Sequence, residues 1–477
     1  MPARPRITTF VPALVTRDAE FDHFEGVRDD YVPLVEAFVA RAGADAVAWL
    51  AEAARSHDEA GPVALVGGRL VDGSGAPPIE DAVVVYEGDR ILAAGPRATT
   101  SVPANARRVD VHGQTILPGL WDMHAHVEQV EQAAVYLAAG VTTVRDEGNI
   151  LEFITSLRDA IDAGRGVGPR IISDGIVDSD SQYAIGTLRV NSAADIAPII
   201  DRLVKAHCNA LKIYSSLKPE LVPALVAEAH RRGLRVTGHV PFGMTIEEAV
   251  DDGFDGINHA EMMSTMVYPR TLAELRKLSR AQRRQLLLGM DVKSPLIQRV
   301  LDKMAARHVA FDPTLAVEEE EYFTGAELDR REPGRAKLPR VLRDQFPGID
   351  PAHAAEGAEE FHKWLEVVGE AHRRGVPIVA GTDQSILGHS LHRELELYVE
   401  AGFTPMEALQ SATSVPAKLL GRDQELGTVS VGKRADIIVV AGNPLVDIRD
   451  TRKVTLVIAR GHAYEPAPLW KLAGFQP

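Results

Sequence analysis

The feature that most constrains the fold is the alternation of short apolar runs with helical stretches over the middle of the chain. Eight such runs can be counted, at 115–126, 141–146, 170–175, 210–214, 234–239, 256–260, 309–314 and 377–383. The intervening stretches, such as 219–233, carry apolar residues at helical spacing. Repeated strand–helix units predict a parallel sheet, and eight strands can close a barrel. We therefore expect an α/β fold with a (β/α)8 TIM-like barrel over 118–419.

The segments that flank this region have a different pattern. Residues 62–117 and 420–477 are rich in β-branched runs separated by Gly-centred turns. They predict a small β-sandwich domain built from both chain ends. Residues 1–61 form an N-terminal helical extension in this scheme, with Gly43 expected to divide it into two short helices. This extension could cap the main body or serve as a subunit-contact arm.

Composition and charge exclude several classes of function. The chain has 52 Lys and Arg against 67 Asp and Glu, a net charge of −15, which disfavours nucleic acid and anionic membranes as partners. No run of about 18 apolar residues occurs, and no secretory leader is recognised, so we expect a cytoplasmic protein. Cys208 is the only cysteine. A metal ion would therefore depend on His, Asp, Glu or a modified side chain.

Polar residues of metal-binding type stand at the ends of the predicted strands. His124 and His126 end the first run, and side chains at i and i+2 of a strand point to the same face. Such a pair could bind one ion, although alone it could equally be a chance pair on a surface strand.

The other strand ends repeat this pattern. Lys212 lies inside an apolar run, where a lone ammonium would be costly to bury, and His239, His259 and Asp383 each close a run. Barrel enzymes place their catalytic groups at these carboxyl ends. Six such residues on five strands would not be expected by chance, so the sequence predicts a metal-dependent active site.

These residues fall within motifs that cover roughly residues 62–465. The motifs read LPGLWDMHAH, GVTTVRDEG, LKIY, GHV, NHA and AGTD, followed by LQSATSVPAKLLG and GTVSVGKRADIIVV. The sequence resembles the amidohydrolase superfamily, especially its imidazolonepropionase-like proteins and binuclear-metal Xaa-Pro or Xaa-Arg dipeptidases. The N-terminal 60 residues do not share the pattern.

The resemblance implies a set of ligands for two divalent metal ions. The more buried ion would be bound by His124, His126 and Asp383, and the more exposed ion by His239 and His259. Lys212 would carry a carbamate formed with CO2 and would bridge the ions. Zinc is the expected metal because His and oxygen ligands suit it, with manganese or cobalt as alternatives.

The resemblance also implies a mechanism. A metal-bridging hydroxide would attack a carbonyl carbon, with Asp383 as general acid and base. Tyr214, two residues after Lys212, could stabilise the oxyanion or simply pack at the barrel mouth. Arg145 could bind a substrate carboxylate or form a buried ion pair.

The roles of two further histidines near the last predicted strand are also open. His389 and His392 follow Asp383 closely in the chain. They could line the substrate pocket, or they could cap the helix that follows.

The expected function is hydrolysis of a C–N bond in a small N-acyl amino acid, dipeptide or aryl amide. An alternative substrate is an N-aryl urea or carbamate of the herbicide type. A second alternative is a mononuclear imidazolonepropionase-like or deaminase-like enzyme, which would lack the bridging Lys212. A metal-free binding protein should have lost ligands, and none of the six is missing. By analogy with relatives we expect a homo-oligomer.

Residues 315–360 stand out by their charge. They hold 12 acidic and six basic side chains, including the run Glu318–Glu321. Loops after barrel strands hang over the active site, so a lid is one interpretation and a solvated helical excursion the other. An acidic lid would disfavour strongly anionic substrates.

Overall fold

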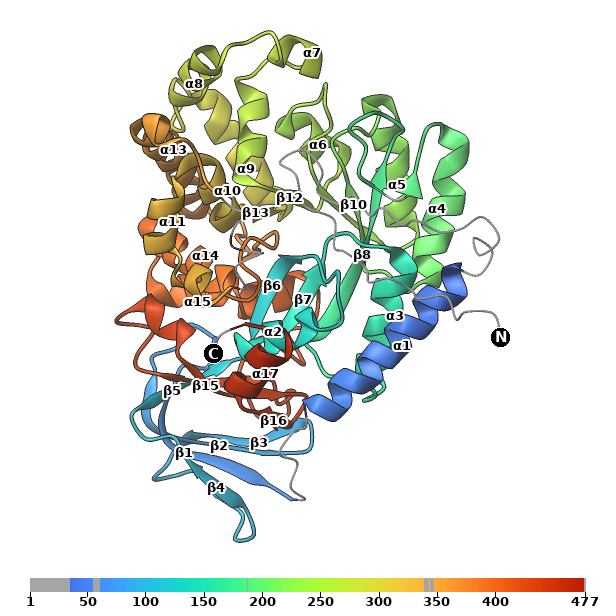
Figure 1. Ribbon diagram of the computed structural model, residues 1–477. Helices are drawn as coiled ribbons and strands as arrows, with labels where there is room; N and C mark the ends of the chain where they lie inside the picture. Colours follow the sequence, from blue (N-terminus) through green and yellow to red (C-terminus); the bar gives the residue numbers. More distant parts are fainter. Residues whose placement is uncertain (1–34, 55–60, 187, 339–342, 344–346, 476–477) are drawn as a thin grey trace, which may run out of the picture.

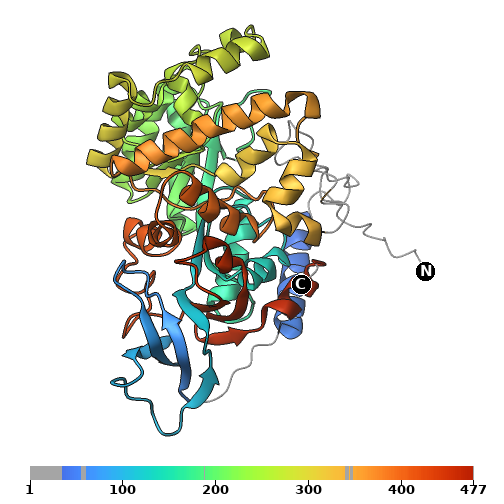
Figure 2. The same ribbon diagram turned by 90° about the vertical axis from the view of Figure 1, so that its left-hand side faces the viewer.

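A computed structural model describes residues 35–54, 61–186, 188–338, 343 and 347–475. It shows a mixed α/β fold. A small, mainly antiparallel sheet lies at one end of the molecule, and an α/β body with a parallel half-barrel sheet lies above it (Figure 1). Figure 2 gives the same arrangement from the side, with helices stacked over the body.

The half-barrel sheet positions most of the polar residues singled out by the sequence. Its strand order is β11 (Arg235–Gly238), β10 (Ala210–Ile213), β8 (Arg170–Asp178), β7 (Val141–Asp146) and β6 (Leu120–Ala125), with β9 (Leu188–Arg189) paired to β8. All of these pairings are parallel. A separate parallel pair joins β12 (Gly256–Asn258) to β13 (Ala310–Asp312). Parallel pairing brings the carboxyl ends of these strands to one edge.

Residues 377–383, predicted as the eighth strand, form an irregular segment instead. They contain one isolated parallel bridge, between Phe311 and Ile378. The segment nevertheless runs between two strands, since Phe311 N donates to Pro377 O at 2.8 Å and Met123 N donates to Ala380 O at 2.8 Å. Regular pairing cannot continue beyond it, because the backbone turns into the left-handed region at Asp383.

Helices surround the half-barrel. They are α1 (Val35–Ala53), α2 (Gln132–Ala138), α3 (Leu151–Asp162), α4 (Ala193–Lys205), α5 (Val222–Arg231), α6 (Ile246–Asp252), α7 (Leu272–Leu275), α8 (Arg280–Leu288), α9 (Pro295–Arg307), α10 (Leu315–Tyr322), α11 (Gly325–Arg331), α13 (Ala354–Arg373), α14 (Ser390–Glu400), α15 (Pro405–Ser411), α16 (Ser414–Leu419) and α17 (Pro466–Leu472). Short 3-10 turns are η2 (Pro219–Leu221), η3 (Ala260–Met266), η4 (Pro333–Lys337), η5 (Pro351–His353) and η6 (Ile448–Arg452). The helices bury apolar stripes, as α5 does with Val222, Leu225, Val226 and Ala229.

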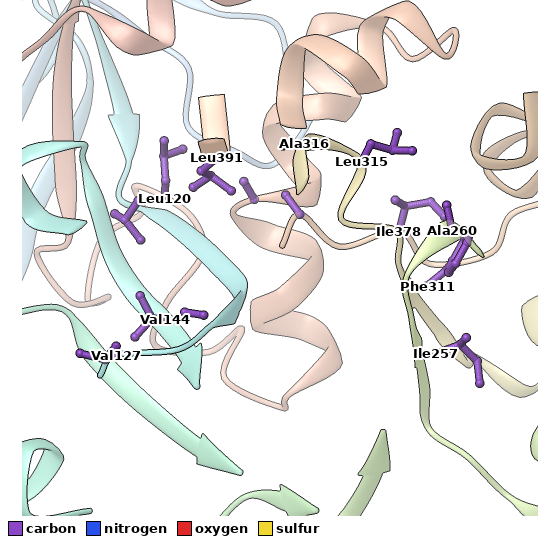
Figure 3. Close-up of a cluster of buried hydrophobic side chains, with 14 of the residues drawn as sticks. Leu120, Val127, Val144, Ile257, Ala260, Phe311, Leu315, Ala316, Ile378 and Leu391 are labelled. Atoms are coloured by element: carbon purple, nitrogen blue, oxygen red, sulfur yellow. The ribbon is translucent and has the colours of Figure 1, made fainter. Parts of the chain in front are cut away.

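Apolar side chains from strands and helices meet in one large core. Figure 3 shows part of it, where Leu120 and Val144 lie on neighbouring strands and Leu391 comes from α14. Ile257, Phe311 and Ile378 belong to the same core and are at most 4% exposed. This packing fixes the strands whose ends carry the polar residues.

The small sheet contains strands from both ends of the chain. Its order is β16 (His462–Tyr464), β15 (Val454–Ala459), β14 (Ile437–Ala441), β5 (Gln114–Pro118), β1 (Val63–Leu70), β2 (Ile79–Glu87) and β3 (Arg90–Pro96), with β4 (Arg107–Asp110) paired to β1. The antiparallel pairing of β14 with β5 joins the two ends. The sandwich arrangement and the domain boundaries stay predictions.

The N-terminal helix differs from expectation in one respect. α1 runs without interruption through Gly43, so the prediction of two short helices is wrong. A single glycine costs a helix only about 1 kcal/mol relative to alanine, which the burial of Val47 and Leu50 can offset. α1 packs along α3 (Figure 1). Residues 1–34 of the predicted extension lie outside the described residues.

The acidic segment after β13 is packed rather than fully solvated. α10 and α11 follow the strand directly, and α10 contacts α13 and α14. Glu319 is 2% exposed and forms a bidentate ion pair with Arg393 of α14 at 2.9 Å. The lid role of residues 315–360 stays a prediction. Among the helices that the structure describes, we find none with both the length and the apolarity to span a membrane.

Candidate metal centre

Four imidazoles, one ammonium and one carboxylate converge at the carboxyl edge of the strands. Nε2 of His126 lies 3.0 Å from Asp383 Oδ1, and Nε2 of His124 lies 3.3 Å from the same oxygen. Nε2 of His259 lies 2.9 Å from Nε2 of His239 and 3.8 Å from Asp383 Oδ2. The donor atoms of His124, His259 and Asp383 all lie within 4.8 Å of one another. The predicted ligands therefore share one cluster.

Each imidazole is held through its other ring nitrogen. Nδ1 of His126 bonds to the carbonyl of Gly148 at 2.8 Å, and Nδ1 of His124 bonds to Asp312 Oδ2 at 2.9 Å. On the other side of the cluster, Nδ1 of His239 bonds to Ser215 Oγ and Nδ1 of His259 to Thr314 Oγ1, both at 2.8 Å. With Nδ1 engaged in this way, the Nε2 atoms are left to face the cluster, as metal ligation requires.

The protonation states also suit a metal. Burial lowers the pKa of His124 and His239 well below the usual value and lowers that of His259 to about 4, so all three are neutral near pH 7. For His126 burial acts in the same direction and is the largest single effect, but the hydrogen bond to Asp383 and the charges of Asp383 and Asp146 together raise the pKa. Burial alone would raise the pKa of Asp383, yet the adjacent imidazoles hold it well below its usual range.

Lys212 lies at the centre of this cluster. It comes from β10, is 2% exposed, and its Nζ lies 2.8 Å from His124 Nε2. An unmodified ammonium at this position repels cations. Lys212 itself could therefore serve as a metal ligand only if its charge changes.

Two of the cluster residues have an unusual backbone conformation. The φ angles of His259 and Asp383 are 58° and 48°, and those of their neighbours Thr314 and Gln384 are 47° and 64°. Left-handed conformations are costly for residues other than glycine and gather at functional sites. In each case the chain turns sharply as it leaves a strand or strand-like segment, which directs the side chain across the mouth of the half-barrel.

Most of the chain is similar in sequence to known proteins. The family model described as "Amidohydrolase family" matches residues 115–464. The chain belongs to the amidohydrolase family. It is 27% identical over 400 residues to an imidazolonepropionase of Pseudomonas paraeruginosa, covering 76% of this chain and 87% of that protein. It is 24% identical over 395 residues to an adenine deaminase of Ruegeria pomeroyi, covering 80% of this chain but only 53% of that protein.

A solved structure gives the same result. A candidate prolidase from Bifidobacterium longum superimposes with a TM-score of 0.62 at 26% identity, over 84% of this chain and 94% of that one. This amidohydrolase is therefore an enzyme of the class that acts on carbon–nitrogen bonds, as expected from the resemblance.

Tyr214 of this amidohydrolase lies beside the cluster of predicted metal ligands. Its ring centroid is 4.2 Å from that of His239, and Lys212 Nζ is 5.8 Å from the Tyr214 ring centroid. The Tyr214 ring thus lies next to two of the predicted ligands. This position fits both roles that the sequence left open, stabilising an oxyanion and packing at the barrel mouth.

Arg145 lies beneath the cluster, in the interior of the half-barrel. Its Nε donates to the carbonyl of Met123 at 2.9 Å, and its guanidinium pairs with Glu147. A distance of 3.8 Å separates Arg145 Nη2 from Asp312 Oδ2. These contacts are those of the buried ion pair that the sequence left open.

His389 and His392 contact the C-terminal part of the chain, and His392 also bonds to the backbone of Ala139. The His389 ring stacks on Trp470 of α17 with centroids 4.4 Å apart, and His392 Nδ1 lies 3.1 Å from Thr451 Oγ1. Within the described residues, neither side chain forms a hydrogen bond with the predicted metal ligands. His389 precedes α14 but makes no capping bond with its side chain.

Sequence reasoning missed several residues that support the cluster. Asp122 accepts from Thr382 Oγ1 at 2.7 Å, which ties β6 to the segment that carries Asp383. Asn258 and Asp312 bond to each other at 2.9 Å behind His124. Asp312 lies near the carboxyl end of a predicted strand, as the six predicted ligands do, so its position was a usable signal. The contacts of Asp122 with a segment 260 residues away left no such signal in the sequence.

Proposed function

We propose that this enzyme is a two-metal amidohydrolase that cleaves an amide or peptide-like C–N bond. The observation that carries this proposal is the convergence of six ligand-type side chains from five separate segments on one buried cluster. The closure of the strands into a complete (β/α)8 barrel, with residues 377–383 in the eighth position, belongs to the same proposal.

The donor set fits two ions better than one. His124, His126 and Asp383 would hold one ion, and His239 and His259 the other. Zinc suits these ligands, with manganese or cobalt as alternatives. When bound, such ions supply Lewis acidity, which lowers the pKa of water and polarises a carbonyl group.

Lys212 would complete the centre as a carbamate formed with CO2. The modification joins Nζ to the carbon of CO2 and releases two protons, one to free the amine and one as the N–C bond forms. It turns an ammonium into an anionic group with two oxygen donors. This change supports the proposal because it removes the repulsion that an ammonium at 2.8 Å from His124 Nε2 would exert on a cation.

Asp383 would move the proton during the reaction. The adjacent imidazoles keep its carboxylate ionised, so it can accept the proton of the attacking water and return it to the leaving nitrogen. Its left-handed backbone and its contacts with His124 and His126 fix its position. Tyr214, in contact with His239, would donate its hydroxyl hydrogen to the developing oxyanion.

The substrate would be a small N-acyl amino acid, dipeptide or aryl amide that carries little negative charge. Glu318 of α10 is 8% exposed, and its electrostatic neighbours include Glu261, Glu321 and Asp383. Burial among these acids raises the pKa of Glu318 well above its usual value. An acidic surrounding of this kind disfavours a strongly anionic group. An N-aryl urea or carbamate meets the same condition and is the alternative substrate class.

A second candidate is a mononuclear enzyme of the imidazolonepropionase or deaminase kind. It is favoured by the compact group His124, His259 and Asp383, whose donor atoms could bind one ion without Lys212. The presence of Lys212 in the cluster favours the two-metal centre.

Metal analysis together with a substrate screen tests the proposal. The purified protein would be stripped of metal, reconstituted with Zn2+ in the presence or absence of bicarbonate, and analysed for metal per chain. Dipeptides, N-acyl amino acids, aryl amides, aryl ureas and carbamates would be tested in parallel. Two ions per chain, bicarbonate dependence and hydrolysis of an amide are expected. One ion per chain with deamination or imidazolone hydrolysis would instead identify the mononuclear enzyme. Gel filtration would test the predicted homo-oligomer.

A further inference from the structure

The bond behind His124 differs from those behind the other three imidazoles. Asp312, the last residue of β13, is 2% exposed and places Oδ2 2.9 Å from His124 Nδ1. His126, His239 and His259 place Nδ1 against a carbonyl or hydroxyl oxygen. His124 is thus the imidazole whose rear nitrogen faces a carboxylate.

A carboxylate in this position determines the tautomer. A neutral imidazole carries one N–H, and a carboxylate accepts hydrogen bonds but cannot donate them. Asp312 therefore keeps the hydrogen of His124 on Nδ1 and leaves the lone pair of Nε2 directed at Lys212 and Asp383. A metal ligand needs a free lone pair, and hydrogen bonding to a carboxylate also makes the imidazole more basic.

Asp312 is itself held in place from two sides. Asn258 Nδ2 donates to the same Oδ2 at 2.9 Å. The Arg145 guanidinium lies 3.8 Å from that oxygen and donates through Nε to the carbonyl of Met123, the residue before His124. The carboxylate and the imidazole are therefore linked to the same arginine.

Gly381 supplies the space for this contact. A Cβ on Gly381 would lie 2.6 Å from the Cβ of His124 and closer still to Asp312 Oδ1. Real side chains do not approach so closely, so any larger residue at this position would displace the pair. The glycine of the AGTD motif is thus explained by the approach of Asp312 to His124.

We propose that Asp312 is a positioning residue that fixes the Nδ1–H tautomer of His124 and so sets the affinity of the metal centre. The inference rests on the proposed metal centre. It assigns a role to a residue outside the ligand set, and its test can fail separately from the test of that centre.

Metal affinity of Asp312→Asn measures this role directly. The variant keeps the size of the side chain but removes the charge and, in one amide orientation, offers a donor to Nδ1. We expect Zn2+ to bind about 10- to 100-fold more weakly than to the wild-type chain in competition with a chromophoric chelator. The absorption spectrum of the Co2+-loaded protein should change as well, because the ligand field at His124 changes.

Asp174→Asn is the matched control. Asp174 is 1% exposed and lies 3.9 Å from Arg145 Nε, but no ligand histidine contacts it among the described residues. Zn2+ affinity of this control should stay within about twofold of the wild-type value. If Asp312→Asn folds poorly, Asn258→Ala replaces it, because that change removes one bond to Asp312. It also removes the longer contact of 3.3 Å between Asn258 Nδ2 and His124 Nδ1. We expect it to weaken Zn2+ binding by a few-fold.

The outcomes separate the two proposals. A wild-type chain that binds no Zn2+ would overturn both. A wild-type chain that binds Zn2+, with an Asp312→Asn variant that is folded and binds equally tightly, would overturn the positioning role alone. Equal weakening in Asp312→Asn and Asp174→Asn would also overturn it, because the effect would then be a general one of buried charge.

Discussion

The small sheet and the metal cluster are both buried, yet they are stabilised in opposite ways. The interior of the sheet consists mainly of Val, Ile, Leu and Ala, including Ile437 and Val439 of β14, both 0% exposed. The cluster consists of ionisable groups that are buried only because each has a partner, such as His124 with Asp312 or His126 with Asp383. Non-directional packing stabilises the first, and directional bonds between charged groups stabilise the second.

This difference also separates stability from activity. Removing methyl groups from the sheet should change the free energy of unfolding and leave the chemistry alone. Changing a group in the cluster should alter the chemistry and leave the fold largely alone. The predictions below test this separation, beginning with the largest expected effect.

Asp383→Asn should reduce kcat by about 1,000-fold, because the proton carrier is lost while the volume of the side chain is kept. Thermal unfolding should be close to that of the wild-type chain. Steady-state kinetics and circular dichroism check the two parts. A near-normal kcat would contradict the role given to Asp383.

Lys212→Met should reduce the metal content from two ions to one and reduce kcat by about 100-fold, because the bridging group is lost. Methionine fills the same buried space without a charge, so the fold should persist. Metal analysis of both proteins, with and without bicarbonate, is the measurement. Two ions in the variant would show that Lys212 is not a bridge.

The two regions also differ in how far the sequence predicts them. β-rich runs separated by Gly-centred turns predicted that both chain ends contribute to a small β-domain, because β-branched residues leave a local signal. In the structure, strands of both ends lie in one sheet. Seven of the eight expected barrel strands are strands in the structure. The eighth failed because the conformation of Asp383 is imposed by contacts with His124 and is not encoded in the apolar pattern.

The six predicted ligands were singled out because each lies at or near the carboxyl end of a predicted strand, which is a local signal combined with topology. The residues behind them were not, because a pair such as His124 and Asp312 is separated by 188 positions. Likewise, Gly43 was expected to break a helix that tertiary packing of Val47 and Leu50 keeps intact. Local rules fail where distant partners determine the structure.

Ile437→Ala should lower the free energy of unfolding by about 3 kcal/mol, because it removes buried methyl groups from the small sheet and leaves a cavity. Its kcat should stay within about twofold of the wild-type value at a temperature where both proteins are folded. Thermal denaturation and kinetics test the two parts. A large loss of kcat would show that the sheet and the metal cluster are coupled.

Glu261→Gln should improve kcat/KM for an anionic substrate relative to its neutral analogue by about two- to fivefold. Glu261 is an electrostatic neighbour of Glu318, so the change weakens the negative field near the cluster. Added salt should reduce the difference, because surface charges are screened. An N-acyl aspartate and the matching N-acyl asparagine provide the pair of substrates. An unchanged preference between these two substrates at low salt would contradict the proposal that the acidic surroundings disfavour anionic substrates.

The smallest expected effect is that of a substitution at His389. It tests whether this side chain packs in the fold or binds substrate. Burial lowers its pKa to about 3, whereas the unfolded chain binds that proton near pH 6.5. Between these values the unfolded state holds more protons, so His389 makes the fold less stable as the pH falls from about 6.5 to 3. His389→Phe keeps the stacking on Trp470 and should reduce this slope by at most about 1.4 kcal/mol per pH unit. Unfolding measured at pH 7 and pH 5 checks the slope.

The Michaelis constant of His389→Phe tests the second role. Nε2 of His389 is buried and has no hydrogen-bond partner in the described part of the chain, so an unchanged KM would identify His389 as a packing residue. A tenfold rise in KM with normal stability would instead place His389 in the substrate pocket.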